Sequence, residues 1–192
     1  MSDAASPVRA PMRRDARAHR AALIDAATAA FETHGYLVPL DSIAERAGIG
    51  RGTLYRNFPD RMALVIAVFE RVVEEISGEI DPALSFHDAV FEIVLRGERG
   101  HALFSRLVGA MPDDATIRAA FASLEQRITR FMAPIIARAR DKGEVRADLD
   151  DATITLTLRM VSGLLMPHMP PAERDDTIRR GLKLLLEGLR PH

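Results

Sequence analysis

Apolar residues recur along the chain three or four positions apart, and no stretch shows the strict alternation of a half-buried strand. Between residues 40 and 47 the apolar positions lie on one helical face, formed by Leu40, Ile43, Ala44 and Ala47. Gly48 follows at once, and glycine readily adopts the left-handed conformation that is common after a helix end. The pattern therefore predicts a short helix that ends in a glycine turn.

A second short helix is predicted from about Arg51 to Asn57, because Pro59 disfavours helical backbone at the residue before it. Leu54 and Phe58 are four residues apart, so they can share the buried face of this helix. The remaining positions keep polar or basic side chains free to point outward, namely Arg51, Thr53, Arg56 and Asn57. Two short helices joined by a turn of about three residues form a helix-turn-helix.

The exposed side chains of the second helix are of the types that bind a DNA groove. Guanidinium groups suit guanine edges or phosphates, a threonine methyl suits thymine, and an amide suits adenine. The phenol of Tyr55 suits a phosphate. The pattern is typical of a helix-turn-helix that reads DNA.

Longer helical patterns flank this motif. A helix over about residues 15–34 carries an apolar stripe that reaches Phe31, and Gly35 stands just past its end. A further helix over about residues 60–76 is apolar on more than one side, as suits a connector between two domains, and Pro82 lies beyond its end. Together these patterns predict a three-helix N-terminal domain followed by a connecting helix.

The rest of the chain divides into helical segments separated by glycine and proline. They are expected at about residues 85–97, 100–110, 113–141, 150–166 and 172–189. Pro134 lies inside the third of them and predicts a kink near residues 130–134. The fold class predicted from the sequence is therefore all-α.

Charge supports DNA binding only through its distribution, because 26 basic residues are balanced by 27 acidic ones. Residues 9–20 hold five arginines against one aspartate, and residues 46–61 hold four against one. Either run alone is as typical of a solvated surface as of a binding site. Beside a helix-turn-helix, both favour contact with backbone phosphate.

No cysteine is present, which excludes disulfides and thiolate zinc sites and fits a reducing compartment. Residues 1–12 lack the apolar stretch of a signal peptide, and no run approaches 18 apolar residues. We therefore expect a cytoplasmic protein without a membrane span.

Residues 31–69 resemble the TetR/AcrR family of bacterial one-component transcriptional regulators. The resemblance rests on FETHGY at residues 31–36 and on IAERAGIGRGTLYRNFPDR at residues 43–61. It implies that Tyr55 contacts phosphate and that Arg61, at the start of the connecting helix, clamps the DNA backbone. Pro39 and Gly50 depart from the family pattern, which often has capping hydroxyls there, and we expect their absence to remove caps and phosphate contacts.

The resemblance completes the expected DNA-binding set, in which the arginines of the first helix reach the groove or its phosphates. The set is Arg13, Arg14, Arg17, Arg51, Gly52, Thr53, Tyr55, Arg56, Asn57 and Arg61. It also implies a homodimer formed by the last two helices, a palindromic double-stranded DNA operator and a small-molecule effector. The most frequent family role is a repressor that its ligand releases from the operator.

The expected organisation has four parts. A flexible arm covers residues 1–12, a DNA-binding domain residues 13–59, a connecting helix residues 60–80, and a regulatory and dimerisation domain residues 81–192. Aromatic and methionine side chains of the last part are the candidates to line an apolar ligand cavity, namely Phe91, Phe104, Met111, Phe121, Phe131 and Met160. The same residue types also form ordinary core. His101 and His168 are candidates to orient a polar group of a ligand.

The sequence offers little support for an enzymatic function. The glycines of residues 48–52 follow a helix and lack the spacing of a nucleotide-binding loop. Glu98 and His101 have the spacing of one arm of a di-iron site, but no second arm occurs. Ser105 and Ser162 have no marked partner for nucleophilic catalysis. We expect no enzyme, cofactor or metal.

Two alternatives to a ligand-released repressor stay open at this point. One is a regulator that responds to no small molecule or that a protein partner controls, which a filled core in place of a cavity would favour. The other is a helical dimerisation module that has lost DNA binding, which Pro39 and Gly50 would favour and which Tyr55, Arg56 and Arg61 argue against.

Overall fold

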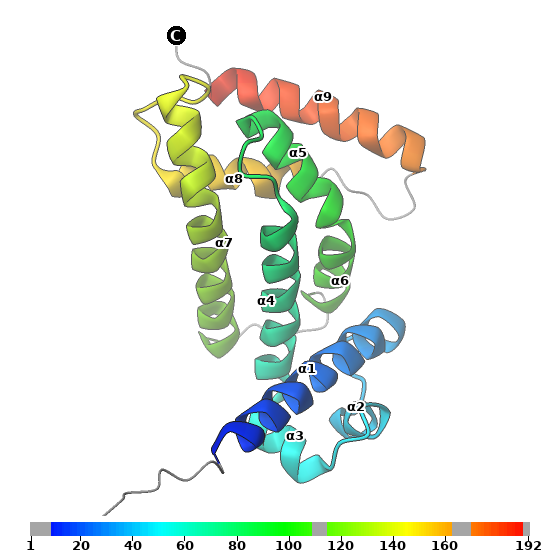
Figure 1. The fold of residues 1–192 in the computed structure, drawn as a ribbon. Helices are drawn as coiled ribbons and strands as arrows, with labels where there is room; N and C mark the ends of the chain where they lie inside the picture. The colour runs from blue at the N-terminus through cyan, green and yellow to red at the C-terminus, as the bar shows by residue number, and fades with distance from the viewer. Residues whose placement is uncertain (1–8, 109–114, 163–169, 190–192) are drawn as a thin grey trace, which may run out of the picture. The chain divides into compact units, whose positions relative to one another are not determined.

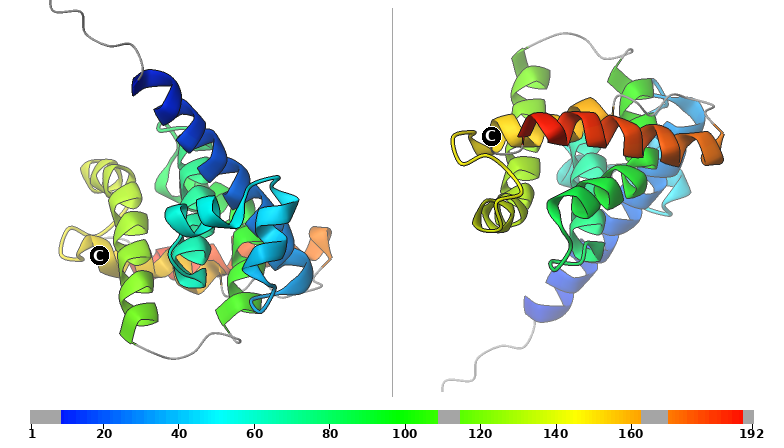
Figure 2. Two further views of the ribbon diagram at one scale, coloured as in Figure 1. Left: turned by 90° about the horizontal axis from the view of Figure 1, so that it is seen from below. Right: turned by 90° about the horizontal axis from the view of Figure 1, so that it is seen from above.

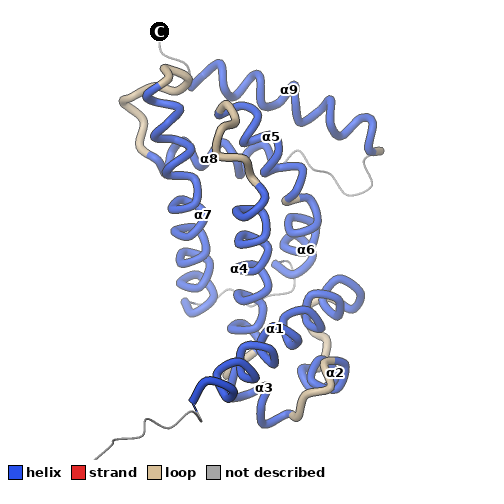
Figure 3. The backbone as a smooth tube through the Cα atoms, viewed as in Figure 1, coloured by secondary structure: helices blue, strands red, loops and turns tan. Residues whose placement is uncertain are grey.

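The structure of the chain is a computed structural model that describes residues 9–108, 115–162 and 170–189. Every regular element within these ranges is an α-helix, and none is a strand (Figures 1 and 3). The all-α fold class predicted from the sequence is confirmed. The helices divide into two compact units, Met1–Val68 and Phe69–His192. The domain boundaries expected from the sequence stay a prediction.

Among its described residues, the first unit contains three helices and the beginning of a fourth. They are α1 (Arg9–His34), α2 (Leu40–Arg46), α3 (Arg51–Asn57) and the first turns of α4 (Arg61–Glu79). Helix α1 packs against both α2 and α3. The core consists of fully buried apolar side chains from all four helices and the segment after α3, among them Leu23, Phe31, Ile43, Leu54, Phe58 and Leu64. This core holds α2 and α3 in fixed register.

Helix α2 ends in the predicted glycine turn. Gly48 has a φ of 66°. Its N–H donates to the carbonyl of Glu45 at 3.0 Å, and the Ile49 N–H donates to the carbonyl of Ala44 at 2.9 Å. This pair of bonds is a Schellman motif, which satisfies the last carbonyls of a helix when a residue with positive φ follows it. The motif directs the chain into α3.

Helix α1 begins at Arg9, six residues before the predicted start at Asp15. The extension contains three arginines, one alanine and one methionine, which are good helix formers. Pro11 falls in its first turn, where proline removes no helical hydrogen bond. Of the flexible arm expected over residues 1–12, residues 1–8 lie outside the described ranges.

The described part of the second unit contains the remainder of α4 and five further helices. They are α5 (Phe86–Arg96), α6 (Glu98–Val108), α7 (Ala115–Asp141), α8 (Asp151–Ser162) and α9 (Pro171–Leu189). Helix α5 packs against α6, α7, α8 and α9, and α8 also packs against α7 and α9 (Figures 1 and 2). Their shared core includes Val90, Met132, Ile136, Ile154 and Leu182.

Helix α7 continues through Pro134, so the proline does not end it. The kink expected near residues 130–134 stays a prediction. Within the described ranges, no helix is long and apolar enough to cross a membrane.

Candidate functional site

Helix α3 has one buried face and one exposed face. Leu54 is fully buried, whereas Tyr55 is 48% exposed and the side chain of Arg51 is 72% exposed. Arg56 is also exposed. A Cβ atom added at Gly52 would meet nothing within 4 Å, so the surface is open at this position. The outward face therefore presents cationic and phenolic groups to solvent, as the sequence predicts.

Contacts within the first unit hold the polar side chains of this face. Nη1 of Arg51 lies 3.0 Å from Oδ2 of Asp41 on α2. Nη2 of Arg56 donates to Oγ1 of Thr53 at 2.8 Å, and Nδ2 of Asn57 donates to the Thr53 carbonyl at 2.8 Å. Side chains that are already ordered lose less conformational entropy when they bind a partner.

Neither short helix has a side-chain cap at its N-terminus. Pro39 precedes α2 and Gly50 precedes α3, and no side-chain hydrogen bond caps either helix. Pro39 and Gly50, the two departures from the family pattern, therefore leave both helices without a side-chain cap.

The family resemblance predicts that Arg61 clamps a DNA phosphate, but in the structure this side chain contacts groups of the protein itself. Its Nη1 donates to the backbone carbonyls of Tyr36 and Val38, in the loop between α1 and α2. Its guanidinium carbon lies 5.3 Å from the centre of the Tyr36 ring. The side chain is thus committed to holding this loop. The sequence gives no signal for these contacts, because both acceptors belong to the backbone.

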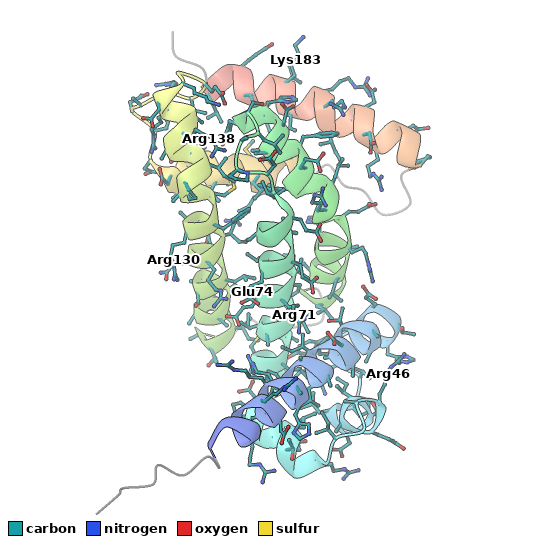
Figure 4. All side chains as sticks on the ribbon, in the orientation of Figure 1. Arg46, Arg71, Glu74, Arg130, Arg138 and Lys183 are labelled. Carbon is teal, nitrogen blue, oxygen red and sulfur yellow. The ribbon has the colours of Figure 1, made fainter. Side chains whose placement is uncertain are left out.

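The basic residues of α1 are only partly described. Arg14 and Arg17 are exposed on the helix, and the side chain of Arg13 lies outside the described part. Arg20 was not among the expected contacts, yet its guanidinium carbon lies 4.5 Å above the ring of Phe58, directly after α3. The run of arginines over residues 9–20 was the available signal for it. Arg46, at the end of α2, is exposed as well (Figure 4).

A cavity of about 380 Å³ lies within the second unit. Its walls come from α4, α5, α6, α7 and α8 and are mostly apolar, with Val72, Val73, Ile76, Ile93, Leu124, Ile128 and Leu158 among the lining residues. Helix α6 approaches α4 closely here, because a Cβ atom added at Gly100 would lie 2.7 Å from Cγ1 of Val72. The volume falls within the range of small-molecule pockets.

Three phenylalanine rings form a cluster in the cavity wall. The ring centres of Phe69 and Phe104 are 5.5 Å apart, and those of Phe104 and Phe121 are 5.4 Å apart, both with the edge of one ring toward the face of the other. Phe69 and Phe121 are 6.4 Å apart. Such geometry suits aromatic rings, whose edges are positive and whose faces are negative.

Four polar or charged residues also line the cavity. Glu125 and Arg159 form an ion pair at 2.6 Å, and both side chains are more than half exposed. Thr155 is 3% exposed, and its hydroxyl donates to the Asp151 carbonyl at 2.6 Å. Burial lowers the pKa of His101 below its ordinary value, because the charged imidazolium loses hydration there.

The structure brings together three of the six residues expected to contact a ligand. Phe104, Phe121 and Phe131 line the cavity. Phe91 is instead buried in the core, with the guanidinium of Arg179 3.9 Å from its ring centre. Met160 is 51% exposed on α8 and is absent from the cavity wall. Met111 and His168 lie outside the described residues.

The cavity residues that the expected set lacks are mainly aliphatic. Valine and isoleucine positions on α4 look like ordinary core in the sequence, and only the arrangement of five helices shows that they border a cavity. The i, i+3, i+4 spacing of Phe69, Val72 and Val73 was the one available signal that these residues share a face.

Helices α8 and α9 each expose apolar side chains. Leu156 and Met160, one turn apart on α8, are 46% and 51% exposed. Leu184 on α9 is 71% exposed. A contiguous apolar patch often marks a protein–protein contact surface, whereas apolar residues that are exposed singly are ordinary.

Comparisons with known proteins agree with this architecture in both parts of the chain. Residues 23–68 match the bacterial regulatory proteins of the tetR family, and residues 81–191 match the C-terminal domain of SbtR-like transcriptional regulators. A TetR transcription regulatory protein from Mycobacterium vanbaalenii, known from its crystal structure, is 31% identical. The similarity covers 94% of this chain and 100% of that chain, with a TM-score of 0.58.

Two relatives from Mycolicibacterium smegmatis (strain ATCC 700084 / mc(2)155) are similar over the N-terminal part alone. The transcriptional repressor KstR is 37% identical over 68 residues, which are 35% of this chain and 33% of the relative. The transcriptional activator FasR is 36% identical over 66 residues, which are 34% of this chain and 30% of the relative. Both are named as helix-turn-helix regulators.

Proposed function

Because the chain belongs to the tetR family of bacterial regulatory proteins, it is a DNA-binding transcriptional regulator and not an enzyme, and we propose that it acts as a ligand-released repressor. In this proposal a homodimer binds a palindromic operator through the two copies of α3, and a small molecule in the cavity weakens that binding. The observation that carries the DNA-binding role is the exposed face of α3, opposite the buried Leu54.

We assign the contacts with DNA to three groups of residues. Arg51, Gly52, Thr53, Tyr55, Arg56 and Asn57 of α3 enter the major groove or contact its phosphates. Arg13, Arg14 and Arg17 of α1 add contacts with the backbone or the adjacent groove. Arg61 supports binding by fixing the loop before α2, and any phosphate contact must use donors other than its committed Nη1.

The proposed dimer forms through α8 and α9. Leu156, Met160 and Leu184 are exposed in the single chain, and association of two copies would remove this apolar surface from water. Closed two-fold symmetry is the commonest arrangement of soluble homo-oligomers. It places two copies of α3 in successive major grooves, with half-sites about 34–36 Å apart.

Repression is the proposed direction of regulation, and the N-terminal similarity does not decide it. A repressor and an activator are similar to this chain over nearly the same length and to nearly the same degree. A reporter gene behind the bound promoter separates the two: deletion of the regulator should raise expression under repression and lower it under activation.

The proposed release of the protein from its operator by a ligand is supported by the cavity and by the position of α4 in its wall. This helix contributes the buried Leu64 and Val65 to the first unit and places Val72, Val73 and Ile76 on the cavity wall in the second. A ligand that binds one position of α4 better than another shifts the protein toward that position. A regulator that responds to no small molecule would need only a filled core. The cavity therefore favours release by a ligand over this alternative.

The experiment that tests the DNA-binding assignment is a titration of the purified protein against DNA tiled across its own promoter region, at several salt concentrations. We expect saturable binding to one palindromic segment and a steep loss of affinity with salt, because bound arginines release counterions from phosphates. Arg56→Ala should weaken specific binding about tenfold or more, since a good base contact contributes about 1–3 kcal/mol of discrimination. Tyr55→Phe should weaken binding by less, since it removes only one hydroxyl.

Arg130→Ala is the matched control. Arg130 is exposed on α7, in the second unit, so the substitution removes the same charge without touching α3 (Figure 4). It should leave affinity for the promoter segment unchanged. Equal losses in the Arg56 and Arg130 variants would show that the overall charge, and not α3, determines binding.

A further inference from the structure

The cavity walls restrict the chemistry of what the cavity can hold. Its volume of about 380 Å³ is roughly two and a half times the ~150 Å³ of an apolar cavity that takes up benzene. This space suits a molecule of two rings, or of one ring with a short substituent. The cluster of Phe69, Phe104 and Phe121 favours an aromatic molecule, because ring pairs gain energy beyond the apolar area that they bury.

The charges on the wall argue for an uncharged molecule. Glu125 and Arg159 neutralise one another through their 2.6 Å ion pair. His101 stays neutral at pH 7, because burial lowers the pKa of its imidazole. Among the described lining residues no charge is left to pair with an ionised ligand, and burying an unpaired charge is costly. A carboxylate would have to share Arg159 with Glu125.

One polar group in the wall selects for a hydrogen-bond donor. Thr155 is the only buried polar residue of the described part of the chain. Its hydroxyl hydrogen is already donated to the Asp151 carbonyl at 2.6 Å. The oxygen can therefore only accept a further hydrogen bond, which a ligand hydroxyl or N–H would supply.

We propose that this cavity binds an uncharged two-ring aromatic molecule that carries a single hydroxyl or N–H donor directed at Thr155. The proposal rests on the proposed function, in which the occupant of the cavity is the effector. It sets this chain apart from a regulator that binds fatty acids, because the described wall holds no unpaired cation for a fatty-acid carboxylate.

The test uses four probes and isothermal titration calorimetry with the full chain, in the absence of DNA. The probes are 2-naphthol, 2-methoxynaphthalene, 2-naphthoate and decanoate. We expect 2-naphthol to bind at least tenfold more tightly than either anion. It should bind about three- to tenfold more tightly than 2-methoxynaphthalene, whose oxygen carries no hydrogen, as the loss of one hydrogen bond predicts.

Substitutions at Thr155 locate the donor contact. In Thr155→Val the preference for 2-naphthol over 2-methoxynaphthalene should disappear, while Thr155→Ser should keep it. Thr129→Val is the matched control, because Thr129 on α7 makes the same hydrogen bond to a carbonyl four residues earlier, that of Glu125, and does not line the cavity. It should retain the preference.

Three results would overturn the proposal. They are tighter binding of 2-naphthoate or decanoate, a preference that survives in Thr155→Val, and absence of measurable binding of 2-naphthol at millimolar concentration. Release from promoter DNA is measured separately, so the two proposals can fail independently. If 2-naphthol binds with the expected preferences but does not release DNA, the ligand class stands and ligand release fails. If decanoate binds more tightly and releases DNA, release stands and the ligand class fails.

Discussion

A single side chain, that of Arg61, satisfies two partly buried carbonyls of the loop between α1 and α2. Removing it leaves both acceptors without this donor, and each such loss costs about 1–3 kcal/mol. Because both carbonyls are only partly buried, the low end of the summed loss applies, and we expect Arg61→Ala to lower the free energy of unfolding by about 2 kcal/mol, measured by urea unfolding followed by circular dichroism. Arg61→Lys should recover only part of the loss, because an ammonium lacks the planar fork of donors.

Arg56→Ala provides the comparison for Arg61. The Arg56 side chain is exposed and bonds only to the neighbouring Thr53 hydroxyl among the contacts described, so its removal should change stability by less than about 0.5 kcal/mol. Equal stability of the Arg61→Ala variant and the native protein would refute the role of Arg61 as an anchor of the loop.

Protonation of His101 should make the free energy of unfolding depend on pH. Burial lowers the pKa of its imidazole in the folded chain, so the unfolded chain binds the proton more tightly. The stability that the neutral side chain contributes is therefore complete above the ordinary pKa of 6.5 and is lost as the pH falls below it. The charged side chains on the same cavity wall are Glu125 and Arg159, which form an ion pair with one another.

The free energy of unfolding should consequently fall less between pH 7.5 and pH 5.5 in His101→Asn than in the native protein. Urea unfolding at a series of pH values measures this difference. Parallel curves for the two proteins would contradict the assignment of a lowered pKa to His101.

Some features of single residues could be predicted from the sequence, and others could not. The outward position of Arg51, Tyr55 and Arg56 follows from helical spacing around Leu54, because that spacing fixes which side chains face the core. The hydrogen bonds of Arg61 do not follow, since backbone carbonyls have no signature in the sequence. Phe91 could not be separated from the cavity phenylalanines, because residue type does not tell core from cavity wall.

At the scale of helices, the turn between α2 and α3 depends on Gly48. Its φ of 66° lies in the left-handed region, where a side chain with a Cβ atom costs about 1–2 kcal/mol. Gly48→Ala should therefore lower the free energy of unfolding by about 1–2 kcal/mol. Because the turn sets the position of α3, the same substitution should also weaken DNA binding.

Gly50→Ser is the matched control for Gly48, two residues away. Gly50 has a φ of −63° and precedes α3, and an added Cβ atom would meet nothing within 4 Å. A serine there can cap the helix, so stability should stay the same or rise by a few tenths of a kcal/mol. A Gly48→Ala variant as stable as Gly50→Ser would show that the left-handed turn is dispensable.

The sequence predicts most helices closely. Arg51–Asn57 coincides with the predicted helix, and α9 begins one residue before the predicted start, since apolar periodicity and flanking proline or glycine mark such ends. The predicted start of α1 is six residues too late, because an arginine-rich stretch has helical propensity without an apolar stripe to reveal it. The cavity depends on the packing of five helices, and the spacing of Phe69, Val72 and Val73 indicates only that these residues share a face.

At the scale of the whole molecule, the proposed dimer depends on apolar side chains of α8 and α9. Leu184 is 71% exposed in the single chain, and a charge there would have to be buried if two copies associate. We expect Leu184→Glu to convert dimers into monomers, as measured by size-exclusion chromatography with light scattering. Because a palindromic site needs two linked copies of α3, the variant should also lose most of its affinity for the promoter segment.

Leu37→Glu controls for the added charge. Leu37 is 76% exposed, so it resembles Leu184 in residue type and exposure, but it lies in the loop between α1 and α2 of the first unit. This variant should remain dimeric. Dimers that persist in Leu184→Glu would place the interface elsewhere on the chain.

The most direct test of a dimeric, sequence-specific regulator is selection of bound sites from a library of random double-stranded DNA, followed by sequencing. We expect enrichment of one palindrome whose half-site centres lie about one helical turn apart, roughly 34–36 Å, and loss of this enrichment in the Arg56→Ala variant. Recovery of a single unpaired half-site, or of no enriched sequence at all, would refute dimeric, sequence-specific binding through α3.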